Sequence, residues 1–303
     1  MLENYSSWAQ RNGFSNWAIA LLWIIVAFIC FQIVAAIIFA IAFFFKSLLY
    51  GIPEGSSLEV LSKNFGLLFI GNSIGQVLVL AFGTWLFCRL QVSREKRNAF
   101  LRFKVNNKTL LFTGLALLAI ISVQPFIWFL GWLNSLLPAP EMFDSLQLQQ
   151  MDVLQSYISN KENFVLLILF HISLIPAFCE EILFRGYVLR SFQRSWGYVT
   201  AIIISGIIFG MFHLQATHLL PLIVIGMLLG YLAWIAESII PAIAAHFLNN
   251  AGSVFLVRFF PESEMTSTTA VTLPPVWLIL LSIIITFMIL HYLYQQRPVR
   301  VKI

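Results

Sequence analysis

Residues 178–186 read Phe178-Cys179-Glu180-Glu181-Ile182-Leu183-Phe184-Arg185-Gly186, inside an otherwise apolar run. Two adjacent carboxylates and a guanidinium therefore lie among residues that favour lipid. A charged side chain at the centre of a membrane helix costs about 3 kcal/mol even on lenient insertion scales. Because three such groups occur together, each must be paired with a partner or used in chemistry. The question that follows is which groups elsewhere in the chain face Glu180.

The composition indicates a membrane protein of the all-α class, a polytopic transmembrane helical bundle. Of 303 residues, 60% are hydrophobic and only 10% are charged, and the mean hydropathy is +0.88. Soluble domains have about a quarter of their residues charged, so a soluble enzyme is excluded. The net charge of +5 comes from basic loops, which report orientation, and no nucleic-acid partner is expected. The three cysteines lie in separate apolar runs without a CxxC pair, so neither a disulfide nor a zinc–thiolate site is expected.

Apolar runs of about 20 residues set the expected topology. We predict eight transmembrane helices: Trp17–Phe45, Gly66–Arg89, Thr109–Trp132, Asn163–Leu189, Tyr198–His213, His218–Glu237, Ile239–Val257 and Pro275–Tyr294. The fifth is short for a full span, which predicts tilt or an end buried in protein. The amphipathic run 137–162 is expected to lie on the outer membrane surface.

Basic residues predict the orientation of the bundle. The loop after the second run contains Arg89, Arg94, Lys96, Arg97, Arg102, Lys104 and Lys108. The C-terminal tail contains Arg297, Arg300 and Lys302. The positive-inside rule puts this loop and both termini in the cytoplasm, in agreement with an even number of spans. The expected location is the plasma membrane, as a multi-pass protein in contact with the lipid bilayer.

Spacing predicts which groups of the fourth run pair with each other. Glu181 and Arg185 are four residues apart, so they share a helix face and are expected to form an ion pair. Glu180 points about 100° away and has no partner within its own helix. Pro176 lies four residues earlier, where it is expected to kink the helix and free a carbonyl.

Two later helices present polar groups on faces of small residues. His213 follows Gly206 and Gly210 at helical spacing, and His246 is followed four residues later by Asn250. Small residues in a membrane helix mark faces that pack against other helices, so both histidines are expected to point inward. Together with Glu180, they supply what is needed to activate a water molecule and stabilise an oxyanion.

Three motifs in this order resemble those of the CPBP family of intramembrane proteases, which comprises CAAX prenyl proteases and bacteriocin-processing (Abi) proteins. The EExxxR pattern appears at Glu180–Arg185, FxxxH at Phe209–His213, and HxxxN at His246–Asn250. The resemblance covers about residues 163–257. It implies three parts: a transmembrane scaffold in 1–162, a four-helix catalytic core in 163–257, and a final helix with a basic tail in 258–303.

The resemblance implies an endopeptidase that hydrolyses a membrane-anchored protein or peptide substrate, of which a prenylated CAAX-like protein is one type. Glu180 would be the general base, with His213 holding the same water. His246 and Asn250 would stabilise the oxyanion. In supporting roles, Glu181 and Arg185 would fix the helix and tune Glu180.

The family is usually labelled a metalloprotease, so zinc is a candidate cofactor. Glu180, His213 and His246 would then form a His₂Glu ligand set, a known catalytic type. The soluble zinc motif HExxH is absent, and a metal-free glutamate mechanism uses the same residues. Both mechanisms stay open at this point.

Other functions are weighed against the protease. Gly71–Gly75 matches the nucleophile pattern GxSxG, but that motif needs a strand–turn–helix context, and here it favours a helix-packing face. A transporter or proton relay also uses membrane carboxylates and histidines, but transporters usually show two related halves. A non-catalytic immunity or scaffold protein is the third class.

Overall fold

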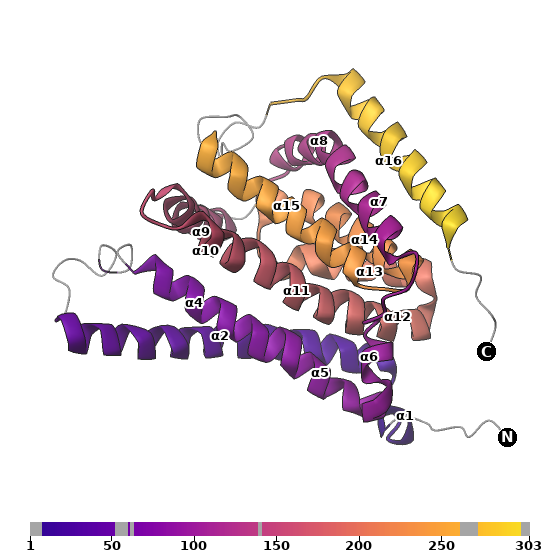
Figure 1. Cartoon of the computed structure of the whole chain (residues 1–303), viewed down its shortest axis with the longest axis horizontal. Helices are drawn as coiled ribbons and strands as arrows, with labels where there is room; N and C mark the ends of the chain where they lie inside the picture. Colours follow the sequence, from indigo (N-terminus) through magenta and orange to yellow (C-terminus); the bar gives the residue numbers. More distant parts are fainter. Residues whose placement is uncertain (1–7, 52–59, 61–63, 139–140, 261–271, 298–303) are drawn as a thin grey trace.

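The structure is a computed structural model that describes residues 8–51, 60, 64–138, 141–260 and 272–297. Every regular element in these ranges is a helix, which confirms the predicted all-α bundle (Figure 1). Within the described ranges, six helical runs are long and apolar enough to cross a membrane: Asn16–Tyr50, Phe65–Leu90, Val165–Trp196, Ala216–Ala236, Ile240–Phe259 and Val276–Gln296.

Three of these runs are single helices, namely α2 (Asn16–Tyr50), α15 (Ile240–Phe259) and α16 (Val276–Gln296). The second run consists of α4 (Phe65–Gly75), the π-helical η1 (Gln76–Gly83), α5 (Thr84–Phe87) and η2 (Cys88–Leu90). The run around Glu180 consists of α10 (Val165–Ile168), the π-helical η4 (Leu169–Leu174), α11 (Ile175–Glu181), the π-helical η5 (Ile182–Val188) and α12 (Leu189–Trp196). Another begins with η6 (Ala216–His218) and continues as α14 (Leu219–Ala236).

The two remaining predicted spans differ from a straight membrane helix. The third is a pair, α7 (Thr109–Ser122) and α8 (Gln124–Ser135), bent by 43°. Pro125 lies at the start of α8 and cannot donate a backbone hydrogen bond, which explains why the helix breaks there. The fifth is α13 (Tyr198–Phe212), an apolar helix that is shorter than a full span, as predicted. With these two, the eight predicted runs all have a helical counterpart.

One predicted boundary that matters for the site is wrong. The fourth run was expected to end at Leu189, but the helix continues to Trp196. The added turns of α12 are amphipathic, with Phe192 fully buried and polar residues on the other side. Glu180 therefore lies near the middle of a 32-residue helix rather than toward its end.

Shorter helices occur outside the spanning runs. They are α1 (Trp8–Arg11), η3 (Arg94–Lys96), α6 (Arg97–Phe100) and α9 (Glu141–Ser159). Helix α9 accounts for most of the predicted amphipathic segment. Its Gln147 bonds Thr217 and, at 2.8 Å, His218 Nδ1, so the helix is attached to the loop between α13 and α14.

Glycines let pairs of helices approach closely. A Cβ atom at Gly71 would lie 2.6 Å from the Ala35 carbonyl oxygen of α2, and one at Gly75 would lie 2.8 Å from the Phe31 oxygen. A Cβ at Gly206 would lie 2.9 Å from the Met227 backbone nitrogen of α14. These contacts are shorter than real Cβ contacts, so the backbones meet where the sequence predicted small-residue faces.

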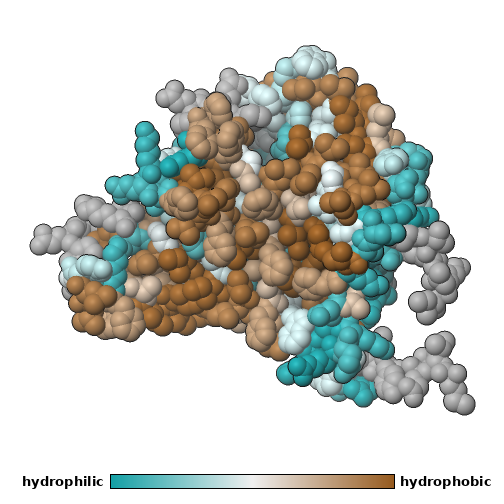
Figure 2. All heavy atoms as spheres, viewed as in Figure 1, coloured by the Kyte–Doolittle hydropathy of each residue, from teal (hydrophilic) through white to brown (hydrophobic). Residues whose placement is uncertain are grey.

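The surface has the pattern of a protein that crosses a membrane. Figure 2 shows a broad hydrophobic band across the molecule, with hydrophilic residues gathered at one end near α1, α6 and α12 and at the other near α9. On α2, isoleucines at every fourth position are half exposed, from Ile25 to Ile41. Such a face is satisfied by lipid, which supports an integral membrane location.

Candidate active site

The centre of the site is a buried ion cluster around Glu181, whose side chain is fully buried. Its Oε1 accepts hydrogen bonds from Arg185 Nη1 at 2.8 Å and from His246 Nδ1 at 2.9 Å. Arg185 also donates from Nη2 to the Gly226 carbonyl at 3.0 Å. The predicted Glu181–Arg185 pair is therefore present, and it is extended to α14 and α15.

The cluster depends on every member being present. Removing a charge from water costs several kcal/mol per ion, and this is recovered only when the partners satisfy each other in good geometry. Losing one partner of a buried pair leaves an uncompensated charge, at a typical cost of about 3–5 kcal/mol. Glu181 and Arg185 thus hold the helix that carries Glu180 in a fixed position between its neighbours.

Phe209 separates the two histidines of the site. Its ring lies 4.7 Å from that of His213 and 5.7 Å from that of His246, and the Arg185 guanidinium stacks over it at 4.3 Å. A cation over an aromatic face is attracted by the ring quadrupole, more strongly when it is desolvated. This contact explains what the phenylalanine of FxxxH does here, a role that its spacing alone did not show.

Glu180 and His213 face each other across a gap. Glu180 Oε2 lies 3.8 Å from His213 Nε2, too long for a direct hydrogen bond. The other ring nitrogen of His213, Nδ1, lies 2.8 Å from the Phe209 carbonyl oxygen. Since a carbonyl only accepts, Nδ1 carries the hydrogen, and Nε2 of the neutral ring is an acceptor. Two acceptors at this separation can share one water molecule.

Glu180 and His213 are less deeply buried than the ion cluster. The Glu180 side chain is 11% exposed and that of His213 is 23% exposed, whereas Glu181 is fully buried. Oε2 of each glutamate is buried and has no hydrogen-bond partner in the described part of the chain. The two adjacent glutamates differ in that Glu181 also accepts two hydrogen bonds at Oε1, whereas Glu180 has only His213 facing it.

Asn250 makes a contact that the sequence reading did not anticipate. Its Nδ2 donates at 3.5 Å to the carbonyl oxygen of Ile172. This carbonyl lies four residues before Pro176, which has no N–H to offer it. Asn249 bonds Asn250 at 3.3 Å and accepts in turn from Gln124 at 3.2 Å, at the break between α7 and α8. Asn250 thereby joins α15 to the helix of Glu180 and keeps a second N–H for another partner.

The predicted zinc ligands do not form one group in this arrangement. Among the described residues, no three of His, Cys, Asp and Glu are placed so that they could hold a metal ion together. Nδ1 of His246 bonds Glu181, and His213 is paired with Glu180 alone. The donor set does not fit a three-ligand zinc site, so no reaction step is derived through a metal here.

Several polar groups outside the three motifs have structural partners. Ser73 Oγ, from the GxSxG match, lies 2.7 Å from His171 Nδ1, and both side chains are buried. This bond joins α4 to η4 across the bundle. His218 is held by Gln147 of α9, and His291 bonds Gln295 on the last helix. Sequence spacing could not pair Ser73 with His171, because they are 98 residues apart.

Comparison with known families gives one match, which covers the segment that contains the site. Residues 162–252 match the model of the family described as type II CAAX prenyl endopeptidase Rce1-like. The match assigns this segment, which is less than half of the chain, to the CPBP family of CAAX proteases. The matched segment contains all three motifs and the whole of the Glu180 helix. No curated protein and no solved structure matches the chain.

Proposed function

We propose that this protein hydrolyses a peptide bond of a membrane-associated protein or peptide with a water molecule activated by Glu180. The family match over residues 162–252 supports a CAAX-type intramembrane endopeptidase as the general class. The observation that carries the residue assignment is the 3.8 Å gap between Glu180 Oε2, a buried atom without a hydrogen-bond partner among the described residues, and His213 Nε2.

The reaction requires no group beyond these side chains and a water. The water binds between Glu180 and His213. As its oxygen attacks the scissile carbonyl carbon, Glu180 takes one of its protons. The tetrahedral intermediate carries a negative oxygen, and Glu180 returns the proton to the amine as the C–N bond breaks. A carboxylate that has an unpartnered oxygen and is held by a rigid helix suits this role.

His246 and Asn250 are proposed to stabilise the oxyanion. The hydrogen bond to Glu181 fixes the ring of His246 through Nδ1, so Nε2 is the nitrogen that is left for a substrate. In its protonated form, His246 donates from Nε2 to the oxyanion. The free N–H of Asn250 is the second donor. Donors that are held in place before the reaction cost no reorganisation when charge develops.

The substrate is proposed to be a lipid-anchored chain, including prenylated CAAX-like proteins. Phe178, two residues before Glu180 and about 200° around the helix from it, is 42% exposed, so the helix that carries Glu180 borders lipid on its other side. Substrates are proposed to reach the site sideways from the bilayer. The proposed location is the plasma membrane with both termini in the cytoplasm, on the strength of the basic loop and tail.

The test is cleavage of synthetic peptides by the full chain in lipid nanodiscs. Each peptide carries a C-terminal CAAX-like sequence, with or without a farnesyl group on its cysteine. We compare the native chain with Glu180→Gln and with Glu162→Gln, a matched control at an exposed glutamate before the helix. We expect a loss of about 100-fold or more only for Glu180→Gln. Cleavage by Glu180→Gln at the native rate would overturn the assignment.

A further inference from the structure

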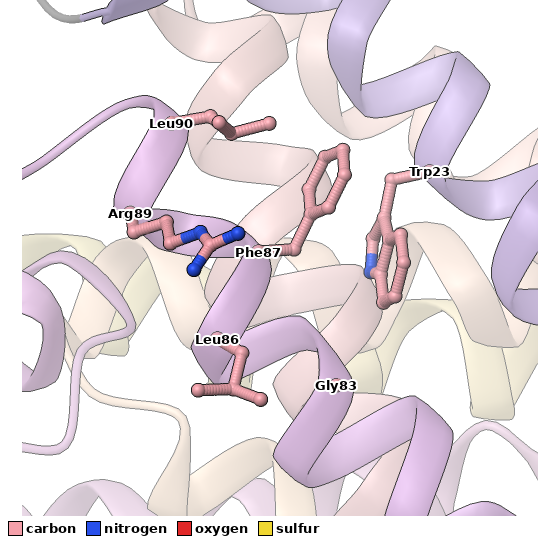
Figure 3. Close-up of a pocket in the computed structure, with 6 residues that line it drawn as sticks. All are labelled: Trp23, Gly83, Leu86, Phe87, Arg89 and Leu90. Atoms are coloured by element: carbon pink, nitrogen blue, oxygen red, sulfur yellow. The ribbon is translucent and has the colours of Figure 1, made fainter.

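A pocket of about 300 Å³ lies on the opposite side of the Glu180 helix from α15, between α2 and the end of the second spanning run. Its walls are drawn in Figure 3 and consist of Trp23, Gly83, Leu86, Phe87, Arg89 and Leu90. Five of these residues are apolar and one is an arginine. None belongs to the ion cluster or to the proposed catalytic residues.

The apolar walls are rigid before any ligand binds. The rings of Trp23 and Phe87 stack at 4.3 Å with an interplanar angle of 15°. Trp23 Nε1 donates to Thr84 Oγ1 at 2.8 Å, so the indole has its polar group satisfied and its position fixed. A Cβ atom at Gly83 would come within 3.3 Å of the Trp23 ring, so any side chain here would intrude on it. A preformed apolar pocket costs little ordering when a chain enters it.

The pocket opens toward the lipid-facing surface of the bundle, close to the basic loop that begins at Arg89. Leu86 is 39% exposed, and Phe82, one turn earlier on the same run, is 53% exposed. Trp17 and Trp196 pair nearby at 5.4 Å between ring centroids, at the ends of two spanning helices. Tryptophans at helix ends are typical of the membrane boundary. The pocket therefore reaches from the apolar layer to the level of lipid headgroups.

Arg89 places an unused positive charge at the rim of the pocket. Its side chain is exposed, and no hydrogen bond or ion pair joins it to another described residue. Neighbouring arginines are engaged, since Arg97 stacks on Trp85 at 4.8 Å and Arg194 on Phe100 at 4.5 Å. The loop that begins at Arg89 contains seven basic residues and one acidic residue, Glu95. Such a loop raises the local concentration of anionic lipid.

We infer that this pocket is a binding site for an anionic phospholipid. One acyl chain lies against Trp23 and Phe87, and the phosphate binds the guanidinium of Arg89. Arginine matches phosphate oxygens with paired donors, and such charged bonds are stronger than neutral ones. A soluble phosphate would leave the apolar walls unused, and a zwitterionic lipid brings no net charge to Arg89. The inference does not depend on the proposed catalytic residues.

The test measures lipid retained by the full chain in native mass spectrometry. The protein is equilibrated with dioleoyl phosphatidylglycerol or with dioleoyl phosphatidylcholine, in the same detergent. We expect the native chain to retain one phosphatidylglycerol with about tenfold preference. Arg89→Gln removes this preference, whereas Arg94→Gln, the same charge change in the same loop but outside the pocket, leaves it within about twofold.

A second variant tests the apolar half of the site without changing charge. Leu86→Trp fills the pocket and is expected to lower phosphatidylglycerol retention several-fold, whereas Phe82→Trp, on the same lipid-facing surface, does not. Equal loss in Arg89→Gln and Arg94→Gln would mean diffuse attraction by the loop and would overturn the site. Displacement of the lipid by farnesyl methyl ester would also overturn it, because the pocket would then hold a substrate chain.

Discussion

His246 Nδ1 lies 2.9 Å from Glu181 Oε1, so the histidine of the third motif bonds the second glutamate of the first motif and not the first. The two carboxylates in sequence thereby have separate tasks. Glu181 holds Arg185 and His246 in place, and Glu180 is left to face His213. The charge of Glu181, the more deeply buried of the two, is compensated by two hydrogen-bond donors.

The first prediction is that substitutions of the two glutamates differ in their effect on the stability of the protein. Glu181→Gln removes the charge that compensates buried Arg185, so we expect a loss of about 3–5 kcal/mol in unfolding free energy. Glu180→Gln is isosteric at a site with no hydrogen bond to Oε2, so we expect a change below about 1 kcal/mol. Thermal unfolding in a single detergent measures both. Equal shifts for the two variants would contradict the division of roles.

The second prediction concerns His246. Because its ring is oriented by Glu181, His246→Gln is expected to lower kcat by about 100-fold while KM changes less than about threefold. A residue that only packed helices together would change both constants through loss of folded protein. The measurement is steady-state cleavage with the concentration of folded enzyme determined separately. The control is His291→Gln, a histidine of the last helix that bonds Gln295.

The third prediction links Asn250 to the proline kink. Asn250 donates to the Ile172 carbonyl, which Pro176 leaves without its backbone donor. Pro176→Ala restores an N–H, so Asn250→Leu is expected to cost less stability in that background than in the native chain. A double-mutant cycle should give a coupling energy of about 0.5–1.5 kcal/mol. Strict additivity of the two changes would show that the carbonyl is satisfied in another way.

The fourth prediction concerns Ser73 and His171. Their bond of 2.7 Å is buried between two helices, so we expect Ser73→Ala to cost about 1 kcal/mol and to leave the cleavage rate within about twofold. A fluorophosphonate probe should not label the protein. Labelling that is lost in Ser73→Ala would instead identify Ser73 as a nucleophile and support the interpretation of Gly71–Gly75 as a serine-hydrolase motif.

The fifth prediction concerns metal. The three predicted ligands do not converge in the described part of the chain, so the protein after dialysis is expected to contain well below one zinc per molecule. Cleavage should persist within about twofold in a chelator. Stoichiometric zinc, together with chelator-sensitive activity restored by zinc alone, would show that His246 exchanges Glu181 for a metal.

Hydropathy and local spacing were sufficient for most of the fold. The eight apolar runs have helical counterparts, and the Glu181–Arg185 pair follows from their separation of four residues within one helix. The continuation of the fourth run to Trp196 was missed because α12 carries charged residues on one face. The 43° break was missed although Pro125 is visible in the sequence, since the run was read as one straight span.

Contacts between helices that are far apart in the chain could not be predicted from the sequence. The pairing of His246 with Glu181 rather than Glu180 depends on how two helices are rotated about their axes, and adjacent residues differ by only about 100°. The Ser73–His171 bond, the Arg185–Gly226 bond and the docking of Gln147 on His218 likewise join segments 41–98 residues apart. Periodicity shows which face is polar, but not which face of another helix lies opposite.

The close approach of backbones at Gly71, Gly75 and Gly206 has a consequence for how variation in this chain should be interpreted. In a saturation scan scored by the amount of protein in the membrane, these glycines should be among the least tolerant positions, because any Cβ meets backbone atoms within 3 Å. In the same scan scored by turnover per molecule, Glu180 should dominate. The two maps would share few positions, so a variant's abundance says little about its chemistry.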